Sequence, residues 1–171
     1  MKTKFKAELE KFNDSLYPFH VKVPKDIYDQ YAEAKIKRIM VSFNSGEKIH
    51  NALLPKGKNT YYIKLSKAVM KAQGLNVGDL LDVEIEEDKS KYGVPLAPEM
   101  KELLLQDVEG EQLFHKLTPG KVRSLLFKVS GYKSSDKRIE TGVIILEHLK
   151  ANEGKLDWKM LNEAFKTGLK I

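Results

Sequence analysis

Apolar and polar residues alternate along several short stretches in the first half of the chain. In "FKAEL", Phe5, Ala7 and Leu9 recur at every second position, which places their side chains on one face of a β-strand. The same alternation runs through "FHVKV" (19–23), "RIMVSFN" (38–44) and "YYIKL" (61–65), and a further strand is expected through "KIHNALL" (48–54). The pattern predicts a β-rich first half, with Gly46 adopting a positive φ in the turn "NSGEK".

The spacing of apolar residues changes after Pro95 and Pro98. Met100, Leu103 and Leu104 are the first to recur at helical intervals. Thr118 and Pro119 are typical of an N-cap and a first helical residue, and a core stripe follows at Leu125, Leu126 and Val129. The chain is therefore predicted to be an α+β protein, with a β-rich domain over residues 1–93 and an α-helical domain over residues 94–171.

Two further helices are predicted near the C-terminus. Ser135 is placed to cap a helix that Gly154 ends. The last amphipathic segment offers four residues to a core: Leu156, Trp158, Leu161 and Phe165.

The β-rich half contains an internal repeat. Moved along by 42 positions without a gap, "FHVKVPKDIYDQYAEAKIKRIMVSFN" falls on "YYIKLSKAVMKAQGLNVGDLLDVEIE". Val21 then meets Ile63, and Val41 meets Val83, so that apolar positions coincide on both strands and on the helix between them. This match indicates the duplication of a strand–helix–strand unit.

The repeated unit has local start and stop signals. In the second copy, Ser66 is expected to cap the helix, Gly74 to stop it, and Leu75 and Val77 to lie beneath it. One unit cannot bury its apolar face alone. Two interlocked copies are expected to close a small double-split β-barrel and to remove most free strand edges.

Composition limits the classes of protein to consider. There is no cysteine, hence no disulfide, thiolate metal site or cysteine nucleophile. The N-terminus lacks the apolar run of a signal peptide, and the strongest apolar run, "GVIIL" (142–146), is too short to span a bilayer. These features favour a cytoplasmic protein without membrane insertion.

Positive charge gathers in one segment of the helical half. The chain has 30 basic and 24 acidic residues, a net charge of +6, and residues 116–138 hold seven basic residues against Asp136. This excess favours an anionic ligand there, and the helix starts at Thr118 and Ser135 would add backbone donors. An ordinary solvated pair of helices is the alternative. The candidate ligand-binding residues are Lys121, Arg123, Lys128, Lys133, Lys137 and Arg138.

No catalytic or metal-binding motif stands out. The histidines are His20, His50, His115 and His148, and we expect structural or surface roles for them rather than a metal site. The acidic run "EIEED" (84–88) is expected to be solvated at a strand end, where it could shield an edge rather than catalyse. There is no G-x-S-x-G elbow and no P-loop, so we predict no cofactor and no enzymatic activity.

Part of the second repeat resembles a known transcription-factor unit. "LSKAVMKAQGLNVGDLLDVEIEED" (65–88) is similar to the swapped hairpin of AbrB- and MazE-type proteins, in which two chains interlock into one barrel. Two copies in one chain would close that barrel without a partner, so closing the barrel is compatible with a monomer.

The domain order resembles the bacterial YdeI/OmpD-associated, or bacteriocin-protection, family. The phrase "FHKLTPGKVRSLL" (114–126) and Lys137, Arg138 and Ile139 are similar to that family's helical half, although the family's tryptophan and "ETR" are absent here. The resemblance covers about residues 3–155. It implies a single-chain barrel, a helical domain and a non-enzymatic role in bacteriocin or stress tolerance.

Three functions are therefore considered. The first is a non-enzymatic cytoplasmic protein that binds an anionic or protein ligand through the basic segment. The alternative is an AbrB-like DNA-binding regulator, disfavoured because the barrel half has a single arginine, Arg38, and an acidic last strand. A small-molecule enzyme comes third and would need a deep pocket between the two domains.

Overall fold

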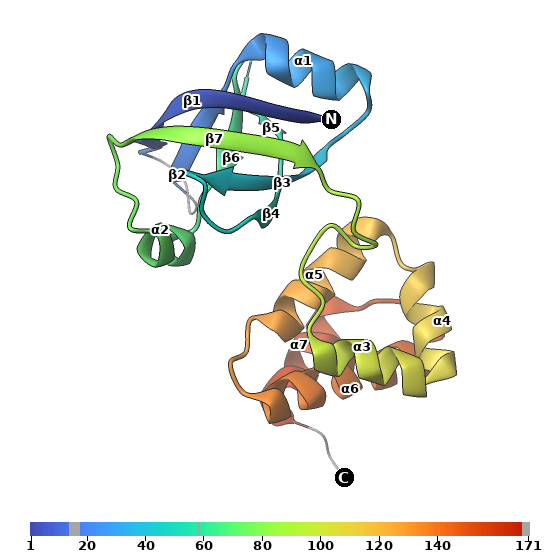
Figure 1. Ribbon diagram of the computed structural model, residues 1–171. Coiled ribbons are helices and arrows are strands. Elements are labelled where there is room, and N and C mark those ends of the chain that lie inside the picture. The colour runs from blue at the N-terminus through green and yellow to red at the C-terminus, as the bar shows by residue number, and fades with distance from the viewer. Residues whose placement is uncertain (14–17, 58, 169–171) are drawn as a thin grey trace. The chain divides into compact units, whose positions relative to one another are not determined.

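The chain folds into two compact units, Met1–Gly93 and Val94–Ile171. A computed structural model describes residues 1–13, 18–57 and 59–168. The first unit is an antiparallel sheet that curls into a nearly closed barrel, and the second is a set of helices (Figure 1). This arrangement confirms the predicted α+β class, with a barrel followed by a helical region.

The barrel closes because the two ends of its sheet are neighbours in sequence. Its strands are β1 (Lys2–Lys11), β2 (Phe19–Val23), β3 (Arg38–Phe43), β4 (Ile49–Ala52), β5 (Leu54–Pro55), β6 (Tyr61–Lys64) and β7 (Leu80–Glu87). All pairs are antiparallel, in the order β4-β3-β7-β1-β2-β6-β5. Leu53 alone separates β4 from β5, so one bent segment joins the ends and leaves few free strand edges.

The strand register follows the predicted repeat. In the ladder between β2 and β6, Val21 opposes Ile63. In the ladder between β3 and β7, Ser42 opposes Glu84. Both pairs are 42 positions apart (63 − 21 and 84 − 42), so each ladder is centred on two residues that the repeat makes equivalent. The two copies are thus related by a pseudo-twofold axis.

The structure extends the repeat to the first strand of each copy. Leu9 donates its backbone N–H to Asp79 at 2.9 Å, and Leu53 donates its own to Lys37 at 3.2 Å. Asp79 follows Lys37 by 42 positions, whereas Leu53 follows Leu9 by 44. A two-residue insertion therefore hid the match between β1 and the β4–β5 segment from an ungapped comparison.

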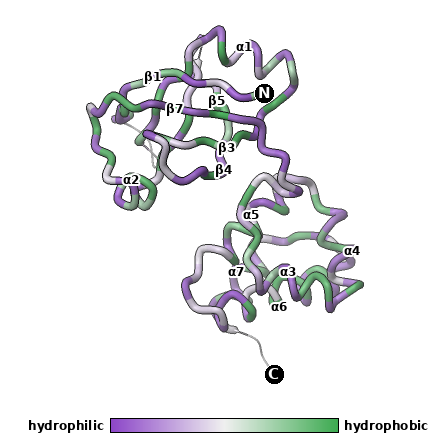
Figure 2. The backbone as a smooth tube through the Cα atoms, viewed as in Figure 1, coloured by the Kyte–Doolittle hydropathy of each residue, from purple (hydrophilic) through white to green (hydrophobic). Residues whose placement is uncertain are grey.

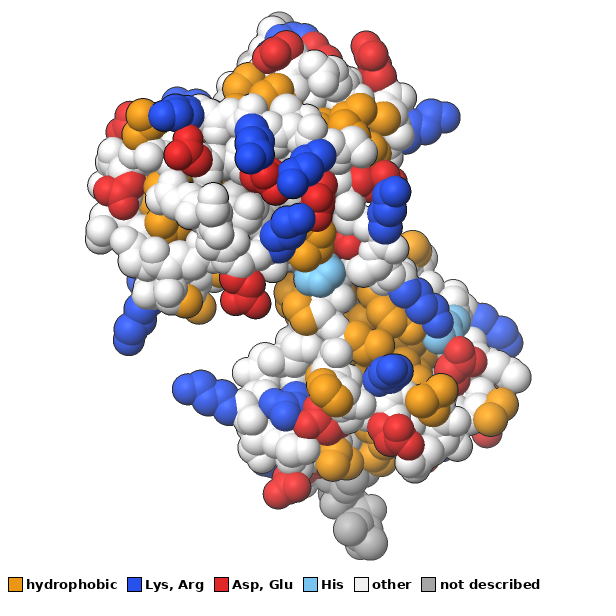
Figure 3. Space-filling view, in the orientation of Figure 1, with side chains coloured by type: hydrophobic (Ala, Val, Ile, Leu, Met, Phe, Trp, Pro, Cys, Tyr) orange, Lys and Arg blue, Asp and Glu red, His pale blue; other side chains and the backbone are white. Residues whose placement is uncertain are grey.

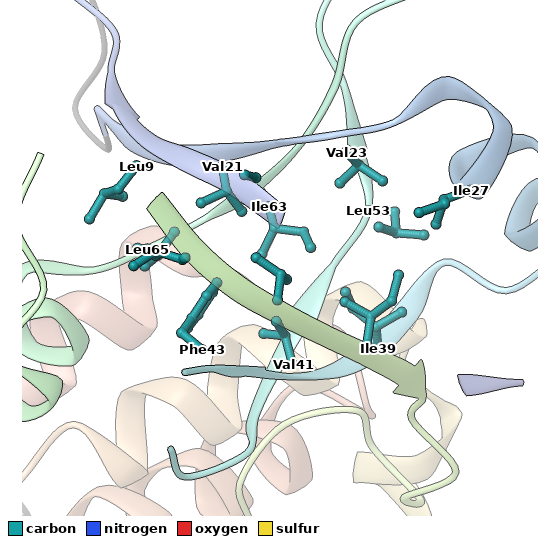
Figure 4. Packing of buried hydrophobic residues seen from close by; sticks show 14 of the residues in the cluster. Leu9, Val21, Val23, Ile27, Ile39, Val41, Phe43, Leu53, Ile63 and Leu65 are labelled. Carbon is teal, nitrogen blue, oxygen red and sulfur yellow. The ribbon is translucent and has the colours of Figure 1, made fainter. Parts of the chain in front are cut away.

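The core of the barrel is made of equivalent residues from the two copies. Val21 and Ile63, and likewise Val41 and Val83, are buried pairs. Figure 4 shows side chains of β2, β3 and β6 pointing into one shared interior. Burying apolar side chains at about 25 cal/mol per Å² is the main favourable contribution to closing such a barrel.

The two short helices of the barrel unit differ in how they pack. The helix α1 (Lys25–Glu33) buries Ile27 and Tyr31, whereas α2 (Lys67–Gln73) buries no residue. Tyr31 donates its hydroxyl to the carbonyl of Ile85 at 3.1 Å and so anchors α1 to β7. α2 instead packs the partly buried Met70 against the core, and Gln73 donates its side-chain N–H to the carbonyl of Glu47 at 3.4 Å.

Both ends of α2 confirm the predicted signals. The hydroxyl of Ser66 accepts the N–H of Val69 at 3.2 Å, and Gly74 has φ 65° as the C-cap residue. Leu75 is buried as predicted. The prediction for Val77 was wrong, because half of its surface is exposed in the turn that follows.

The turn after β3 also differs from the prediction. Positive φ angles occur at Asn44 and Ser45, not at Gly46. Gly46 suits its place because a Cβ there would lie 3.0 Å from the carbonyl oxygen of Phe43. The turn "PKGKNT" contains Lys58, which lies outside the described residues.

The acidic run, which forms the end of β7 and continues into Asp88, does not shield an edge. β7 pairs with β1 on one side and with β3 on the other. The edge prediction therefore failed because strand order depends on long-range pairing, which periodicity does not report.

The second unit is arranged around one long helix. Its helices are α3 (Pro98–Gln106), α4 (Val108–Lys116), α5 (Pro119–Ser130), α6 (Ser135–Ala151) and α7 (Trp158–Thr167). α6 contacts all four of the others. Hydrophilic and hydrophobic positions are interspersed along these helices (Figure 2), and Leu125, Leu126 and Val129 are buried as predicted.

Two local predictions for this unit were wrong. Ser134, not Ser135, caps α6, through the N–H of Lys137, while Ser135 donates its hydroxyl to Glu99 at 2.7 Å. Trp158 opens α7 with 41% of its surface exposed, and Leu161 is the buried residue of that helix. The amphipathic stripe of α7 is narrower than its sequence suggests.

Candidate functional site

The six basic residues predicted to bind an anion lie on α5, on α6 and in the turn between them. Lys121, Arg123 and Lys128 belong to α5, Lys133 lies in the turn, and Lys137 and Arg138 belong to α6. At about 100° per residue, Lys121 and Lys128 share one flank of α5 and Arg123 lies on the other. The fold therefore spreads the six over two helices and does not gather them at one point.

Arg138 is occupied within the chain. Its Nε and Nη2 donate to the two carboxylate oxygens of Glu99 at 2.8 and 2.7 Å, and Nη1 donates to the carbonyls of Tyr132 and Lys133 at 2.9 and 3.0 Å. The guanidinium and the hydroxyl of Ser135 hold the pKa of Glu99 down at about 2. Arg138 thus ties α6 and its preceding turn to the first turn of α3.

Two of the other basic residues also have partners. The ammonium of Lys137 lies 2.5 Å from Glu140, and this bond raises the pKa of Lys137. The ammonium of Lys128 lies 5.0 Å from the ring centre of Phe165 and 5.4 Å from that of Tyr132, within reach of a cation–π interaction.

Lys121, Arg123 and Lys133 differ from these three. They form no ion pair or hydrogen bond through their side chains within the described ranges. Phe127 is one turn beyond Arg123, about 40° around the helix, and 53% of its surface is exposed. The outward face of α5, here called the α5 face (Lys121, Arg123, Phe127 and Lys128), thus has an aromatic centre with cations on both flanks.

Six lysines of the barrel unit form ion pairs with carboxylates. Lys2 and Lys4 both reach Glu84, at 2.9 and 3.1 Å, and Lys48 reaches Glu86 at 2.6 Å. Lys6 with Asp82, Lys22 with Glu10, and Lys25 with Asp29 form further pairs. Figure 3 shows the blue and red side chains interleaved on this side of the barrel. These six lysines of the barrel unit are therefore compensated, whereas Lys121 and Arg123 of α5 form no ion pair among the described residues.

A second candidate site on the barrel combines a histidine with a buried carboxylate. Nδ1 of His50 lies 2.7 Å from Asp88, whose side chain is 1% exposed. The other oxygen of Asp88 accepts both the N–H and the hydroxyl of Ser90, at 2.9 and 2.6 Å. Burial alone would raise the pKa of Asp88, but the bonds from Ser90 and His50 outweigh it and lower that pKa.

His50 lines a cleft of about 550 Å³ together with Lys2, Met40, Glu86 and Lys89. Because Asp88 holds Nδ1, the imidazole is fixed in orientation, and Nε2 is the ring nitrogen that can form a hydrogen bond with a ligand. Lys6 and Gly46 stand at the pseudo-equivalent positions. The barrel architecture therefore does not require a His–Asp pair in both copies.

A larger cleft of about 590 Å³ lies on the same sheet. Lys4, Lys6 and Lys48 line it together with Asp82 and Glu84. Its charges nearly cancel, so it offers little preference for an anion.

Sequence reasoning missed two histidine–carboxylate contacts, one within a helix and one in the barrel. The first was detectable, because Glu111 stands four residues before His115 and this spacing brings side chains together on a helix; the two side chains meet at 2.7 Å. His50 and Asp88 are 38 residues apart and meet only because β4 and the end of β7 flank β3. In the described ranges, no three His, Cys, Asp or Glu side chains gather as metal ligands.

Comparison with known proteins bears on the barrel. Residues 5–85 match the family model described as "Domain of unknown function (DUF1905)", which fits a β-barrel N-terminal domain. No curated protein matches the chain. The resemblance of the helical unit to the YdeI/OmpD-associated family stays a prediction. Among the described residues, no helix is long and apolar enough to cross a membrane.

Proposed function

We propose that the chain is a non-enzymatic cytoplasmic protein that binds an anionic ligand, or an acidic protein surface, through the α5 face. One observation carries the proposal. α5 has three cations and no carboxylate, and Lys121 and Arg123 make no ion pair within the described residues. Such a helix keeps a positive potential, which attracts and orients an anionic partner.

The contrast with the barrel supports this choice. On the sheet, each of Lys2, Lys4 and Lys48 already has a carboxylate within about 3 Å. An incoming anion would have to compete with those carboxylates, whereas on α5 it would not. A role in bacteriocin or stress tolerance, of the YdeI/OmpD-associated type, is the biological setting proposed for this binding.

The experiment measures binding of a fluorescein-labelled poly-glutamate peptide by anisotropy over a salt series. The double variant Lys121→Glu, Arg123→Glu should weaken binding at least tenfold, about 1.4 kcal/mol. The matched control is Lys67→Glu, Lys71→Glu, which makes the same charge change on the exposed surface of α2. The control variant should keep most of the affinity.

Two results would contradict the proposal. In one, the two double variants lose affinity equally, because net charge alone would then explain binding. In the other, the native chain does not bind the peptide at low salt. Duplex DNA of the same charge is a second probe. A steep salt dependence with DNA and none with the peptide would favour the DNA-binding alternative.

Arg138 does not belong in this test. Reversing its charge would leave Glu99 facing a second carboxylate where it now accepts a bidentate bond, so lost binding could reflect an unfolded helical unit.

A further inference from the structure

The corner between α3 and α4 carries exposed apolar side chains. Leu105 and Val108 are 67% and 65% exposed, more than the other large hydrophobic residues among the described residues of the helical unit. Asp107 lies between them, caps α4 through the N–H of Gly110 at 2.8 Å, and keeps both helix ends in place. Exposed apolar groups close together on a folded unit are typical of contact surfaces.

The same corner is acidic. Residues 98–115 contain five carboxylates against Lys101. Asp107 is held by Lys150 at 3.0 Å, and Glu111 lies beside His115. Glu102 and Glu109 have no cationic partner within the described ranges. The acidic corner (Glu102, Leu105, Asp107, Val108 and Glu109) therefore has an apolar centre with a negative rim.

The α5 face has the opposite charge and a similar layout. Phe127 is its exposed centre, with Arg123 about 40° to one side and Lys128 about 100° to the other. Gly120 and Ser124, near Phe127 around the helix, are small, and a Cβ built on Gly120 would meet no atom within 4 Å. A partner side chain can therefore reach the ring of Phe127.

The two surfaces cannot satisfy each other within one unit. α3 and α4 pack on α6, and α5 packs on α6 separately, without a substantial contact of its own to α3 or α4 (Figure 1). Each surface thus keeps an exposed apolar centre surrounded by charges of one sign. The oppositely charged surface that would complement it is present on every other copy of the chain.

We propose that the acidic corner of one copy docks on the α5 face of a second copy. Leu105 and Val108 would cover Phe127, while Glu109 would approach Arg123 and Glu102 would approach Lys121. If each pair of copies makes this contact once, the contact is heterologous and builds a ring or a chain of copies; if two copies make it in both directions at once, the result is a twofold dimer. The inference rests on the same α5 face as the proposed function and names its partner.

Sedimentation velocity over a concentration series tests the contact. The native chain should show a mass that rises with concentration and falls with added salt. Phe127→Ala should weaken self-association at least tenfold, as expected of an aromatic anchor at the centre of an interface. Lys155→Glu, an exposed charge reversal elsewhere in the same unit, should leave self-association nearly unchanged.

A charge swap makes the test specific for these two surfaces. Arg123→Glu and Glu109→Arg should each abolish self-association alone, because like charges then meet. An equimolar mixture of the two variants should recover it. In the mixture, the carboxylate introduced at position 123 of one variant faces the guanidinium introduced at position 109 of the other, and the unaltered surfaces also pair. Circular dichroism checks that each variant is folded.

Three outcomes would overturn the inference: a native chain that stays monomeric up to about 1 mM, self-association that survives Phe127→Ala, or a mixture that fails to recover it. A monomeric chain that still binds poly-glutamate through Lys121 and Arg123 would leave the proposed function standing and remove the second copy as its partner. Loss of both would remove the α5 face from either role.

Discussion

At the scale of single residues, side chains of the same type have different roles, depending on the groups around them. Arg123 and Arg138 are both basic residues of one segment, yet Arg138 is held by four hydrogen bonds while Arg123 stays open to a partner. The difference lies in Glu99, which is 39 residues before Arg138 and meets it because the start of α3 lies beside the start of α6.

The Glu99–Arg138 pair predicts how the helical unit responds to acid. The folded-state pKa of Glu99, about 2, lies below its ordinary value of 4.5. The stability from this shift is therefore fully present above pH 4.5 and is lost as the pH falls from 4.5 toward 2. Glu99→Gln should flatten this part of the pH dependence and lower Tm at pH 7 by a few °C, on the order expected for one lost interaction.

Trp158, the single tryptophan, lies in the helical unit, so its fluorescence reports thermal unfolding there. Glu102→Gln, on the same helix as Glu99 and without a cationic partner among the described residues, is the control and should keep the native pH profile. Parallel acid profiles for the native chain and Glu99→Gln would show that the pair does not control acid stability.

His50 and Asp88 show the same dependence on surroundings within the barrel. Asp88 is the last residue of an acidic run that was expected to be solvated, yet its side chain is 1% exposed. Bonds from His50 and Ser90 compensate its burial, which would otherwise cost several kcal/mol. Nothing in the alternation of residues 80–88 distinguishes Asp88 from the carboxylates beside it.

At the scale of elements, sequence signals were most reliable where they act locally. The start of α5 at Thr118 and Pro119, its buried stripe and both ends of α2 agree with prediction. These features depend on backbone geometry within one turn. The prediction that failed for α6 chose Ser135 over its neighbour Ser134, and the reason is tertiary, because Glu99 accepts the hydroxyl of Ser135.

Gly142 predicts a test of how α3 and α6 pack. A Cβ at Gly142 would lie 2.5 Å from Cδ1 of Leu103 and 3.2 Å from Sδ of Met100. Gly142→Ala gains about 1 kcal/mol in helix propensity, but overpacking costs about 1–3 kcal/mol. We expect a net loss in the free energy of unfolding, measured by urea denaturation.

The double variant Gly142→Ala, Leu103→Ala should be more stable than the sum of the single effects predicts, by about 0.5 kcal/mol or more. Gly120→Ala is the control, because its Cβ meets nothing within 4 Å, and it should be neutral or stabilising. Strict additivity of Gly142→Ala and Leu103→Ala would contradict the proposed clash.

At the scale of the whole molecule, duplication explains how one chain closes its own barrel. Each copy contributes one strand to the β2–β6 ladder and one to the β3–β7 ladder. Neither copy alone has both partners for any central strand, so neither can bury its apolar face alone.

This arrangement predicts fragment complementation. Residues 1–44 and 45–93, produced separately, should each be largely unfolded as monomers, and an equimolar mixture should recover the barrel. Amide chemical-shift dispersion in NMR spectra checks this outcome. A well-dispersed spectrum from one fragment as a monomer, or no recovery on mixing, would show that the ladders between the copies are not what holds the barrel.

The sequence by itself determined the parts of this protein that depend on near neighbours. Alternation of period two, helical spacing, caps and a 42-residue repeat specify which segments become strands and helices, and where the basic charge of the second half lies. These signals can be recognised in the sequence because they arise from backbone geometry over a few residues.

Only the tertiary structure decided which charges are left without partners. It paired Lys2, Lys4 and Lys48 with carboxylates of β7, used Arg138 to hold Glu99 and buried Asp88 beside His50. It left Lys121 and Arg123 without an ion pair among the described residues, near the exposed Phe127. The physical reason is that a charge is compensated by groups within a few ångströms in space, and those groups come from strands and helices tens of residues away.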